Sequence, residues 1–354
     1  MSRFNYKWNL SDGYPVNGIE NHKLKVFGTF ICGGGSSMGY KLAGYEHLGG
    51  VEIDPEVADV YKTNHKPKYL FIEDIRDFAN RLEFPKELYK LDILDGSPPC
   101  SSFSMAGNRE KDWGKEKVFR EGQALQRLDD LFFDYIKLAK KLQPKVVIAE
   151  NVKGMLQGNA KVYVKRIKKK FEEAGYKVQL FLLNAASMGV PQKRERVFFI
   201  CQRKDLNLPE LKLSFKEEII PYSIIEDLDD KEEVKNKDTR TYLGWVKSKS
   251  GQTFADGIND GGSMFGYTKV NRNDVVKTVV SSNGTYEWHD KLFRKLNNKE
   301  YKLVGTFPLD YNFKKIEPKY LIGMSVPPVM TAQIAYKIYL QWFRNNEFTT
   351  NGRI

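Results

Sequence analysis

The sequence predicts an α/β fold built on a parallel sheet, and two features of its first 200 residues support that prediction. Short apolar runs of strand length alternate with segments in which apolar residues recur at the spacing of one helical face. Strands that are separated by helices in this way pair in parallel. The strands that we expect lie at residues 24–31, 50–53, 91–94, 146–149, 178–183 and 196–201.

The helices between these strands carry start and stop signals. Pro55 occupies a first helical position, which proline favours because its fixed φ suits a helix and its missing N–H is not needed there. Gly175 ends a later helix, as glycine commonly does after a last turn. Longer helices are expected at residues 128–142, 164–174 and 328–343.

The alternation of strands and helices weakens after Gln202. Residues 203–290 are polar, rich in turns and interrupted by glycines such as Gly257 and Gly261. Regular structure returns near Leu292. We therefore expect a main domain at 1–202, a smaller irregular domain at 203–290, and a C-terminal segment at 291–354 that returns to the main domain.

Composition indicates a soluble globular protein. Of the 354 residues, 41% are hydrophobic and 29% are charged, and no apolar stretch reaches the roughly 18 residues that a membrane helix needs. Residues 1–21 are polar and lack the apolar core of a signal peptide. The three cysteines form no disulfide framework, so a reducing cytoplasm is the expected location. Cysteines and histidines never cluster at ligand spacing, so we expect no metal site.

The net charge of +12 suits a polyanionic partner such as nucleic acid. This signal is weak by itself, because A/T-rich genomes encode lysine-rich proteins of every kind. Charge therefore indicates a class of partner without identifying one.

A glycine-rich turn follows the first expected strand. Within Ile31–Gly39, Gly33 and Gly35 let a ligand approach the backbone closely. Glu52 ends the second strand, where its carboxylate can accept hydrogen bonds from ribose hydroxyls. Asp74 follows a further apolar segment and could hold an adenine amino group. An ordinary α/β connection and a dinucleotide site are alternatives, although the glycines do not form a clean G-x-G-x-x-G.

A second turn, Asp95–Ser104, directly follows an expected strand and contains Cys100. Pro98 and Pro99 stiffen its backbone and limit the movement of the cysteine. Turns after the carboxyl ends of strands are where α/β enzymes bind substrates, so Cys100 is a candidate nucleophile. A buried structural cysteine is the alternative that the residue type alone favours.

Charged residues accompany two later strands. Glu150 and Asn151 follow the buried strand at 146–149, where an acid with a raised pKa can donate a proton. An acid that caps a helix or binds ribose is the alternative. Arg194 and Arg196 alternate into an apolar strand, so we expect both on one face of it.

In order, these segments resemble the motifs of the cytosine-5 DNA methyltransferase family, in particular its bacterial restriction-modification members. The glycine-rich turn with Glu52 is similar to the family's cofactor motif, and Pro98-Pro99-Cys100 is similar to its nucleophile loop. The resemblance continues at Glu150-Asn151-Val152, Gln192–Arg196, Arg294-Lys295-Leu296, Glu300, Phe307-Pro308 and Gly323–Pro328, and it covers residues 24–202 and 291–343.

Four positions depart from the family pattern. Thr29 and Ile31 stand where the family usually has an acid and a phenylalanine. Ser36 replaces a usual glycine, and Met324 replaces a usual asparagine. These departures bear on the cofactor contacts and leave the nucleophile, the acid and the arginine pair intact.

The resemblance implies a Rossmann-like methyltransferase sheet that uses S-adenosyl-L-methionine, and a covalent mechanism. Cys100 would attack carbon 6 of a flipped cytosine while Glu150 protonates ring nitrogen 3. Arg196 would hold the base carbonyl with Arg194 nearby, and Asn151 would orient the loop. The implied cofactor contacts are Ile31, Gly33, Gly35, Glu52, Ile53, Asp74, Ile75, Pro98 and Ser325.

The irregular domain at 203–290 takes the place of the family's target-recognition domain. Side chains typical of phosphate and base contacts occur there, namely Lys247, Lys249, Lys269, Arg272, Lys277, Trp245, Phe265 and Tyr267, and more weakly Asn271, Ser281, Ser282 and Asn283. Residues 101–122 resemble the mobile loop that closes over the flipped base. We expect a monomer that binds double-stranded DNA and no membrane, with a separately acting restriction endonuclease as a candidate partner.

Three other functions fit part of the sequence. A transfer-RNA-type cytosine-5 methyltransferase would share the motifs, but the long segment at 203–290 favours DNA. An inactive DNA-binding relative is disfavoured by the intact Cys100, Glu150 and Arg196. A nicotinamide oxidoreductase would explain the glycine-rich turn and leave the Pro-Pro-Cys loop unexplained.

Overall fold

A computed structural model of the chain divides into two compact units. It describes residues 3–14, 18–99, 116–117, 126–127, 130–158, 160–258, 264–282 and 284–344. The sheet unit comprises Gly18–Leu183, Glu195–Ser214 and Ala332–Ile354. The mixed unit comprises Met1–Asn17, Asn184–Arg194 and Phe215–Thr331. The chain therefore passes between the two units several times.

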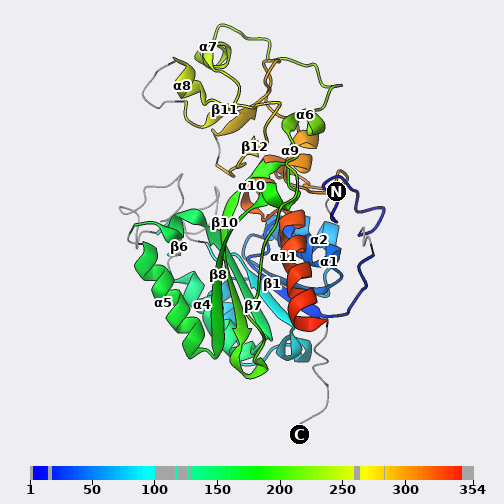
Figure 1. Cartoon of the computed structure of the whole chain (residues 1–354), viewed down its shortest axis with the longest axis vertical. Helices are drawn as coiled ribbons and strands as arrows, with labels where there is room; N and C mark the ends of the chain where they lie inside the picture. The colour runs from blue at the N-terminus through cyan, green and yellow to red at the C-terminus, as the bar shows by residue number, and fades with distance from the viewer. Residues whose placement is uncertain are drawn as a thin grey trace. The chain divides into compact units, whose positions relative to one another are not determined.

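A seven-stranded sheet forms the centre of the sheet unit, in the order β3-β2-β1-β4-β7-β10-β8 (Figure 1). Its strands are β1 Lys25–Thr29, β2 Glu46–Glu52, β3 Tyr69–Ile72, β4 Ile93–Gly96, β7 Val146–Val152, β8 Tyr176–Asn184 and β10 Glu195–Arg203. A separate antiparallel pair joins β5 Glu116–Lys117 to β6 Gln126–Arg127. From β3 to β7 the pairing is parallel, so the carboxyl ends of these five strands meet at one edge of the sheet.

The expectation of a uniformly parallel sheet is wrong at β10. This strand pairs with β7 in the antiparallel direction, with Phe198 opposite Glu150. Residues 185–194 are the whole connection from β8 to β10, and they hold a 3₁₀ turn, Ala185–Met188, and the two-residue strand β9, Gln192–Lys193. A connection between two parallel strands needs a dozen or more residues. The ten residues between β8 and β10 are too few, so β10 runs antiparallel to β8.

Helices cover both faces of the sheet. Figure 1 shows α4 and α5 on one face and α1, α2 and α11 on the other. The helices of this unit are α1 Gly35–Leu42, α2 Pro55–His65, α3 Ile75–Asn80, α4 Leu131–Leu142, α5 Ala160–Glu173 and the part of α11 Pro328–Ile338 from Ala332 onward, with a π-helical turn at Tyr339–Phe343. No helix within the described ranges is long and apolar enough to cross a membrane.

The core of the sheet unit lies between the strands and helices α3 to α5. Phe27, Leu94 and Phe199 from three strands are fully buried in it. Helix α4 contributes the face that its apolar spacing predicted, with Phe132 and Tyr135 fully buried. The predicted amphipathic helix at 128–142 is thereby confirmed from Leu131 onward.

The local signals at helix ends are also confirmed. Pro55 is the first residue of α2, directly after Asp54. The Asp54 carboxylate caps the helix by accepting a hydrogen bond from the Glu56 backbone N–H at 2.9 Å. Gly175 lies just after α5 and has a φ of 98°. Residues with a side chain rarely adopt this backbone conformation, whereas glycine adopts it readily.

The mixed unit consists of short elements around a small aromatic core. Its helices are α6 Tyr222–Ile225, α7 Arg240–Lys247, α8 Phe254–Ile258, α9 Asn298–Val304 and α10 Pro318–Met324, and its strands are β9, β11 Tyr267–Lys269, β12 Val276–Lys277 and β13 Tyr286–Trp288. Phe254, Trp288 and Phe293 are buried together, and the rings of Trp288 and Phe293 stack with centroids 4.9 Å apart. Aromatic packing therefore organises a segment in which sequence periodicity is weak.

Residues 203–214 pack within the sheet unit. The Trp342 indole N–H donates to the Pro209 carbonyl oxygen at 2.9 Å. The Gln341 side-chain amide donates to the Lys212 carbonyl oxygen at 2.9 Å and accepts from the Lys212 N–H at the same distance. The C-terminal part of the chain thus holds this segment against the unit that carries the sheet.

Candidate active site

An ion pair joins β7 to β10 near the carboxyl end of β7. Arg196 Nε lies 2.9 Å from Glu150 Oε1, and the two side chains are only 14% and 12% exposed. Arg196 stands opposite Val152, two residues beyond Glu150, so both charged side chains project from the same face of the sheet. Burial lowers the pKa of Arg196, and the Glu150 charge opposes that shift. The guanidinium stays protonated at neutral pH and fixes the carboxylate in place.

Asn151 holds the turn that leads to Cys100. Its side-chain amide donates to the Pro98 carbonyl oxygen at 2.9 Å, and its amide oxygen accepts from the Val152 N–H at 2.8 Å. Asn151 is buried, so both bonds are shielded from water. The backbone is therefore anchored two residues before the predicted nucleophile. Cys100 itself lies outside the described residues, as does most of the predicted loop at 101–122.

The end of β4 is packed too tightly for a side chain at Gly96. A Cβ there would lie 2.4 Å from Thr29 Oγ1 and 2.8 Å from Tyr135 Cε2. The Tyr135 hydroxyl lies 2.9 Å from the Leu94 carbonyl oxygen and 2.7 Å from the Ile148 carbonyl oxygen. Tyr135 therefore ties β4 to β7 directly before the turns that carry Pro98 and Glu150.

The glycine-rich turn between β1 and α1 presents backbone rather than side chains. Cys32 and Gly34 have positive φ, at 46° and 71°. A Cβ on Gly34 would lie 2.1 Å from His65 Nε2, so only glycine fits there. Gly33 and Gly35 are buried on either side, and α1 begins at Gly35.

Glu52 braces this turn from the end of β2. Its Oε2 accepts a hydrogen bond from the Cys32 N–H at 2.9 Å, and its Oε1 accepts one from the Asp54 N–H at 3.0 Å. Burial raises the pKa of Glu52, and these two hydrogen bonds oppose the shift. A carboxylate offers about four acceptor positions, so Glu52 retains capacity for ligand hydroxyls.

The other predicted cofactor residues of the sheet unit differ in accessibility. Ile53 is 39% exposed, whereas Ile31 and Ile75 are buried. The Ile75 side chain belongs to the core, so it can offer a ligand only its backbone. Asp74 caps α3 through the Arg76 N–H at 2.8 Å and pairs with the Arg76 guanidinium at 2.9 Å. Both Asp74 oxygens thus already have a protein partner.

Two predicted site residues lie in the mixed unit. Ser325 follows α10, and its hydroxyl is buried without a hydrogen-bond partner among the described residues. A buried polar atom of this kind is one that a bound group can satisfy. Arg194 is 2% exposed and donates to the carbonyl oxygens of Val279 at 3.2 Å and Gly323 at 3.0 Å.

The Gln-x-Arg-x-Arg motif is divided between the two units. The sequence predicts Arg194 and Arg196 on one face of one strand, but the structure interrupts the strand at Arg194, between β9 and β10. Arg194 belongs to the mixed unit and Arg196 to the sheet unit. Gln192, like Arg194, bonds to backbone: it donates to the Val304 carbonyl oxygen at 3.3 Å and accepts from the Val279 N–H at 3.2 Å. Alternation along a strand does not reveal where the strand breaks.

Asp95 is a buried acid that sequence reasoning did not assign to the site. The Tyr40 hydroxyl donates to Asp95 Oδ1 at 2.9 Å. Burial raises the pKa of Asp95 to about 7; the hydrogen bond from Tyr40 opposes this rise, and the charge of Glu150 adds to it. The available signal was a charged residue directly after the apolar run at 91–94.

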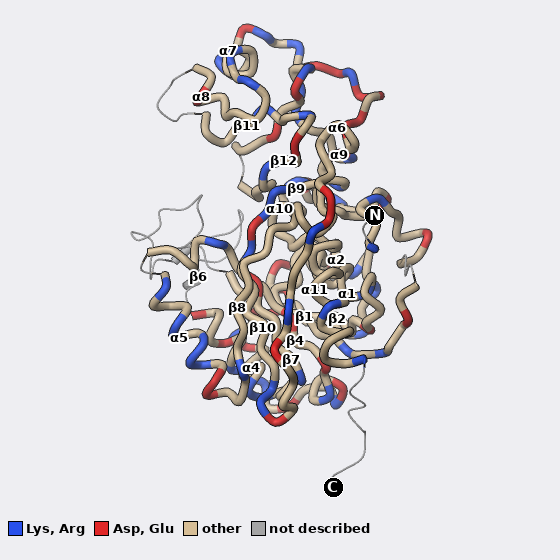
Figure 2. The backbone as a smooth tube through the Cα atoms, in the orientation of Figure 1, with Lys and Arg blue, Asp and Glu red and all other residues tan. Residues whose placement is uncertain are grey.

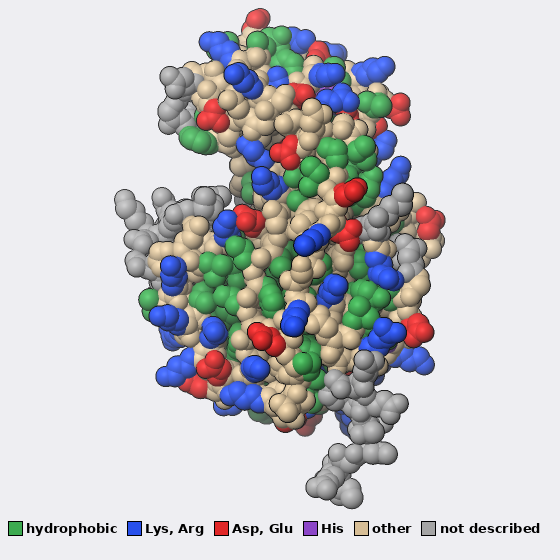
Figure 3. Space-filling view, viewed as in Figure 1, with side chains coloured by type: hydrophobic (Ala, Val, Ile, Leu, Met, Phe, Trp, Pro, Cys, Tyr) green, Lys and Arg blue, Asp and Glu red, His purple; other side chains and the backbone are tan. Residues whose placement is uncertain are grey.

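Some of the residues predicted to contact DNA are exposed to solvent on the mixed unit. Lys247, Lys249 and Lys277 are exposed, and Phe265 is 64% exposed. Figure 3 shows lysine and arginine side chains spread over the visible face of this unit. Asn283 lies outside the described residues. The exposed lysines are the candidates best able to reach phosphates.

Other candidates are engaged within the unit itself. Lys269 Nζ lies 4.3 Å from the centroid of the Trp245 ring and donates to the Trp245 carbonyl oxygen at 3.1 Å. Arg272 pairs with Glu226 at 2.7 Å. The indole N–H of Trp245 donates to the His289 carbonyl oxygen at 2.8 Å. These side chains therefore hold the small unit together.

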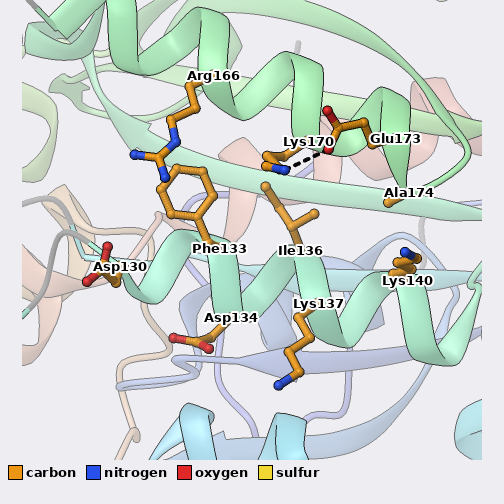
Figure 4. Close-up of a pocket in the computed structure, with 10 residues that line it drawn as sticks. All are labelled: Asp130, Phe133, Asp134, Ile136, Lys137, Lys140, Arg166, Lys170, Glu173 and Ala174. Atoms are coloured by element: carbon orange, nitrogen blue, oxygen red, sulfur yellow. Dashed lines mark hydrogen bonds and ion pairs between the residues drawn. The ribbon is translucent and has the colours of Figure 1, made fainter.

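A pocket lies between α4 and α5, away from the predicted site residues. A hollow between α4 and α5 has Phe133 on its wall, with the Arg166 guanidinium 4.5 Å from the ring centroid (Figure 4). Lys170 on its rim pairs with Glu173 at 2.7 Å. None of the predicted site residues lines it. Among the residues that the structure describes, no group of three or more Asp, Glu, His or Cys side chains could hold a metal ion.

The profile of C-5 cytosine-specific DNA methylases matches residues 24–340. This span contains every residue that the sequence predicts for catalysis or cofactor binding. The match confirms the resemblance that the ordered motifs suggested.

Individual relatives agree with that match. Type II methyltransferase M.FnuDI of Fusobacterium nucleatum is 39% identical over 196 residues, which are 54% of this chain and 51% of the relative. M.NgoPII of Neisseria gonorrhoeae is 37% identical over 219 residues, which are 58% of each protein. The chain thus spans little more than half the length of these relatives. M1.HphI of Haemophilus parahaemolyticus is 28% identical over 342 residues, covering 88% of this chain and 86% of the relative.

Solved structures show the same fold at low sequence identity. Spodoptera frugiperda DNMT2 superposes with a TM-score of 0.62 at 18% identity, covering 90% of this chain and 100% of that one. The Entamoeba histolytica methyltransferase EhMeth superposes with a TM-score of 0.60 at 13% identity, covering 90% and 98%. These likenesses confirm the predicted α/β methyltransferase sheet.

Proposed function

Because the chain belongs to the C-5 cytosine-specific DNA methylase family, we propose that it transfers a methyl group from S-adenosylmethionine to carbon 5 of a cytosine within a specific sequence of duplex DNA. The observation that carries the proposal is the buried pair of Glu150 and Arg196 beside Asn151, whose amide anchors the turn before Cys100. The naming of the relatives as type II methyltransferases supports a role in a restriction-modification system.

The glycine-rich turn fits an adenosyl cofactor. Glu52 keeps acceptor positions for ribose hydroxyls, and the exposed Ile53 offers an apolar surface to a flat ring. The buried glycines on either side of Gly34 add no side chains to the turn. S-adenosylmethionine supplies an electrophilic methyl group when it is bound. The residues present therefore suit the cofactor that the family uses.

Cys100 is the proposed nucleophile. Its thiolate adds to carbon 6 of the cytosine, which makes carbon 5 electron-rich. Glu150 donates a proton or hydrogen bond to ring nitrogen 3 and so offsets the charge that the thiolate brings. Arg196 holds both Glu150 and the carbonyl oxygen of the base. Carbon 5 would then take the methyl group that the bound cofactor supplies. Removal of the proton from carbon 5 would let the Cys100 thiolate leave, and return of the ring nitrogen 3 proton to Glu150 would restore the neutral aromatic base.

The target base is proposed to leave the duplex before it reacts. Neither face of a stacked cytosine is open to a thiolate, so the enzyme must extrude the base. Residues 101–122 are proposed to close over it. The segment at 203–290 is proposed to read the surrounding sequence, with Lys247, Lys249 and Lys277 on phosphates.

Bisulfite sequencing of plasmid DNA from cells that express the protein tests this function. We expect 5-methylcytosine at one recurrent sequence. Glu150→Gln should abolish the signal, whereas Glu195→Gln should retain it, because Glu195 is 42% exposed and pairs with Lys153. An unmodified plasmid from cells that contain folded protein would contradict the proposal.

A transfer-RNA substrate is the alternative within the same family. Purified protein should transfer labelled methyl groups to duplex DNA and not to transfer RNA. The reverse preference would reassign the substrate while leaving the chemistry of Cys100, Glu150 and Arg196 in place.

A further inference from the structure

Two lysines stand side by side on paired strands of the mixed unit. Strands β9 and β12 run parallel, and their register sets Lys277 next to Lys193 and Val276 next to Gln192 (Figure 2). Val276 and Gln192 are 2% and 1% exposed, whereas both lysines are exposed. Successive side chains alternate between the two faces of a strand, so the two ammonium groups are carried on the same, outward face.

Within the described parts of the chain, no acidic side chain forms an ion pair with either lysine. Hydrogen bonds from Thr253 lower the pKa of Asp256, and the charge of Lys277 adds to this shift. The Asp256 carboxylate is nevertheless held by the N–H and the hydroxyl of Thr253, at 3.1 Å and 2.7 Å. Like charges that stand side by side on paired strands repel each other, so the pair weakens the contact of β9 with β12 in the DNA-free protein.

The backbone that carries the two lysines is fixed by hydrogen bonds. The Thr278 hydroxyl donates to the Lys193 carbonyl oxygen at 2.7 Å. The Gln192 amide oxygen accepts from the Val279 N–H at 3.2 Å, and Arg194 donates to the Val279 carbonyl oxygen at 3.2 Å. Neighbouring strands lie about 4.8 Å apart, so the two lysines start from a fixed and short separation.

The chain itself keeps this pair close to the proposed base site. Lys193 precedes Arg196 by three residues, and three residues span at most about 11 Å. Arg196 in turn forms the buried ion pair with Glu150. An anion held by the two lysines is therefore near a DNA strand whose base meets Glu150.

We propose that Lys193 and Lys277 together bind one phosphate of the DNA backbone close to the target cytosine. The inference rests on the proposed function, and it adds Lys193 to the residues that contact DNA. Each ammonium group donates to one of the two non-bridging oxygens of this phosphate, whose negative charge removes the repulsion between the lysines. The contact carries no sequence information, and it holds the strand in position while the base is extruded.

Binding of the full chain to a duplex that contains its methylated sequence tests the shared phosphate. Lys193→Gln and Lys277→Gln should each weaken binding about tenfold at low salt, because each removes one charge-assisted hydrogen bond. The double variant should reduce the slope of log affinity against log salt concentration by about one, since one phosphate contact is lost. A reduction of about two would mean two separate phosphates and would overturn the shared site.

Lys315→Gln is the matched control. Lys315 is an exposed lysine of the same unit that lies in a turn and has no lysine beside it in register. Its replacement removes one positive charge from the unit, as the other variants do, and should leave the affinity and the salt slope unchanged. If it weakened binding as much as Lys193→Gln, the effect would be one of overall charge, and the proposed site would be overturned.

Neutralising one phosphate at a time identifies the bound group. A methylphosphonate placed at single positions along both strands should weaken wild-type binding at one position near the target cytosine. At that position, the same substitution should not change binding of the variant that carries both Lys193→Gln and Lys277→Gln. Equal losses for the two proteins at every position would overturn the inference.

The stability of the DNA-free protein supplies a readout that a purely structural role would move in the opposite direction. Removal of one lysine relieves the repulsion, so each single variant should unfold at the same temperature as the wild type or at a higher one in low salt. High salt should abolish any gain, because it screens the charges. Loss of both stability and DNA affinity would show that the lysine supports the fold, which would overturn the phosphate site.

The outcomes separate this inference from the proposed function. Unchanged DNA affinity in both single variants would overturn the phosphate site and leave the assignment of methyl transfer in place. Folded wild-type protein that methylates no plasmid sequence and binds no duplex would contradict the proposed function itself.

Discussion

Two buried carboxyl groups stand on adjacent strands of the sheet, and their partners suit them to different tasks. Glu150 on β7 pairs with the guanidinium of Arg196. Asp95 on β4 accepts a hydrogen bond from the Tyr40 hydroxyl, and burial raises its pKa to about 7. We propose that Glu150, held by its ion pair, is the carboxyl group that contacts the base.

Replacement of Cys100 by serine should abolish methylation. A hydroxyl is far less nucleophilic than a thiolate at neutral pH, so the first covalent step is lost. Folding and cofactor binding should persist, as measured by thermal unfolding and by calorimetry. Turnover close to that of the wild type in Cys100→Ser would remove this residue from the mechanism.

Duplex DNA that contains 5-fluorocytosine at the target should trap the protein. Fluorine cannot leave carbon 5 as a cation, so the step that frees Cys100 is blocked. A complex that survives denaturant and requires S-adenosylmethionine should appear on a gel, and Cys100→Ser should not form it. Failure of the wild type to form this complex would count against covalent catalysis.

Glu52→Ala should weaken cofactor binding more than the chemical step. The carboxylate would contact the ribose equally in the ground and transition states, so its loss raises the dissociation constant with little change in the single-turnover rate. A hydrogen bond to a charged group is worth about 1.5 to 3 kcal/mol. Calorimetry that shows unchanged affinity would rule out this placement of the ribose.

Among the structural elements, the carboxyl ends of β4 and β7 depend most on close packing. Tyr135 bonds to backbone of both strands, and Gly96 leaves room for its ring. Asn151 then anchors the turn at Pro98. The geometry of the proposed site is thus set by helix α4 and by the absence of a side chain at Gly96, as well as by Glu150, Asn151 and Arg196.

Gly96→Ala should therefore destabilise the protein. The new Cβ would lie 2.4 Å from Thr29 Oγ1, and the ring of Tyr135 is equally confined, so strands must shift to make room. Overpacking of this kind typically costs about 1 to 3 kcal/mol of unfolding free energy, which urea denaturation would measure. Ser97→Ala, which adds no volume at the next position, is the control. Equal stability of Gly96→Ala and the wild type would mean that the end of β4 adapts freely.

Across the entire chain, chemistry and recognition are assigned to different segments. Cys100, Glu150 and Arg196 lie outside residues 203–290. Lysine and arginine residues recur in the mixed unit and along α5, as Figure 2 shows. Phosphate contacts carry no sequence information, so the proposed recognition segment would have to distinguish sequences by base contacts or by DNA shape.

Exchange of residues 203–290 for the corresponding segment of a relative should change the methylated sequence. The catalytic residues are untouched, so the chimera should remain active if it folds. Bisulfite sequencing reports the new site. A folded, active chimera that still methylates the original sequence would place recognition in the rest of the chain.

Lys247→Ala should weaken binding to all DNA sequences similarly. It should also reduce the slope of log affinity against log salt concentration by about one, the amount that corresponds to the loss of one phosphate contact. The side chain is exposed, so stability should not change. Lys269→Ala is the matched control, because Lys269 stacks on Trp245 and should affect stability more than the salt slope. Identical salt slopes for Lys247→Ala and the wild type would show that Lys247 does not contact phosphate.

The linear sequence determined those features that depend on local spacing. Apolar periodicity located six of the seven strands of the main sheet, all but β3, and Pro55 and Gly175 marked helix ends, because these preferences act within a few residues. Ordered motifs identified the family, because the chemistry requires particular residue types in turns after strands.

Only the tertiary structure decided which residues meet. It reversed β10, so that Arg196 lies against Glu150, and it broke the strand at Arg194, which binds backbone carbonyls within the mixed unit. It also brought Asp95 to Tyr40, far away in the sequence. Strand direction, burial and the resulting pKa depend on contacts between distant segments, and no local pattern of residue types encodes those contacts.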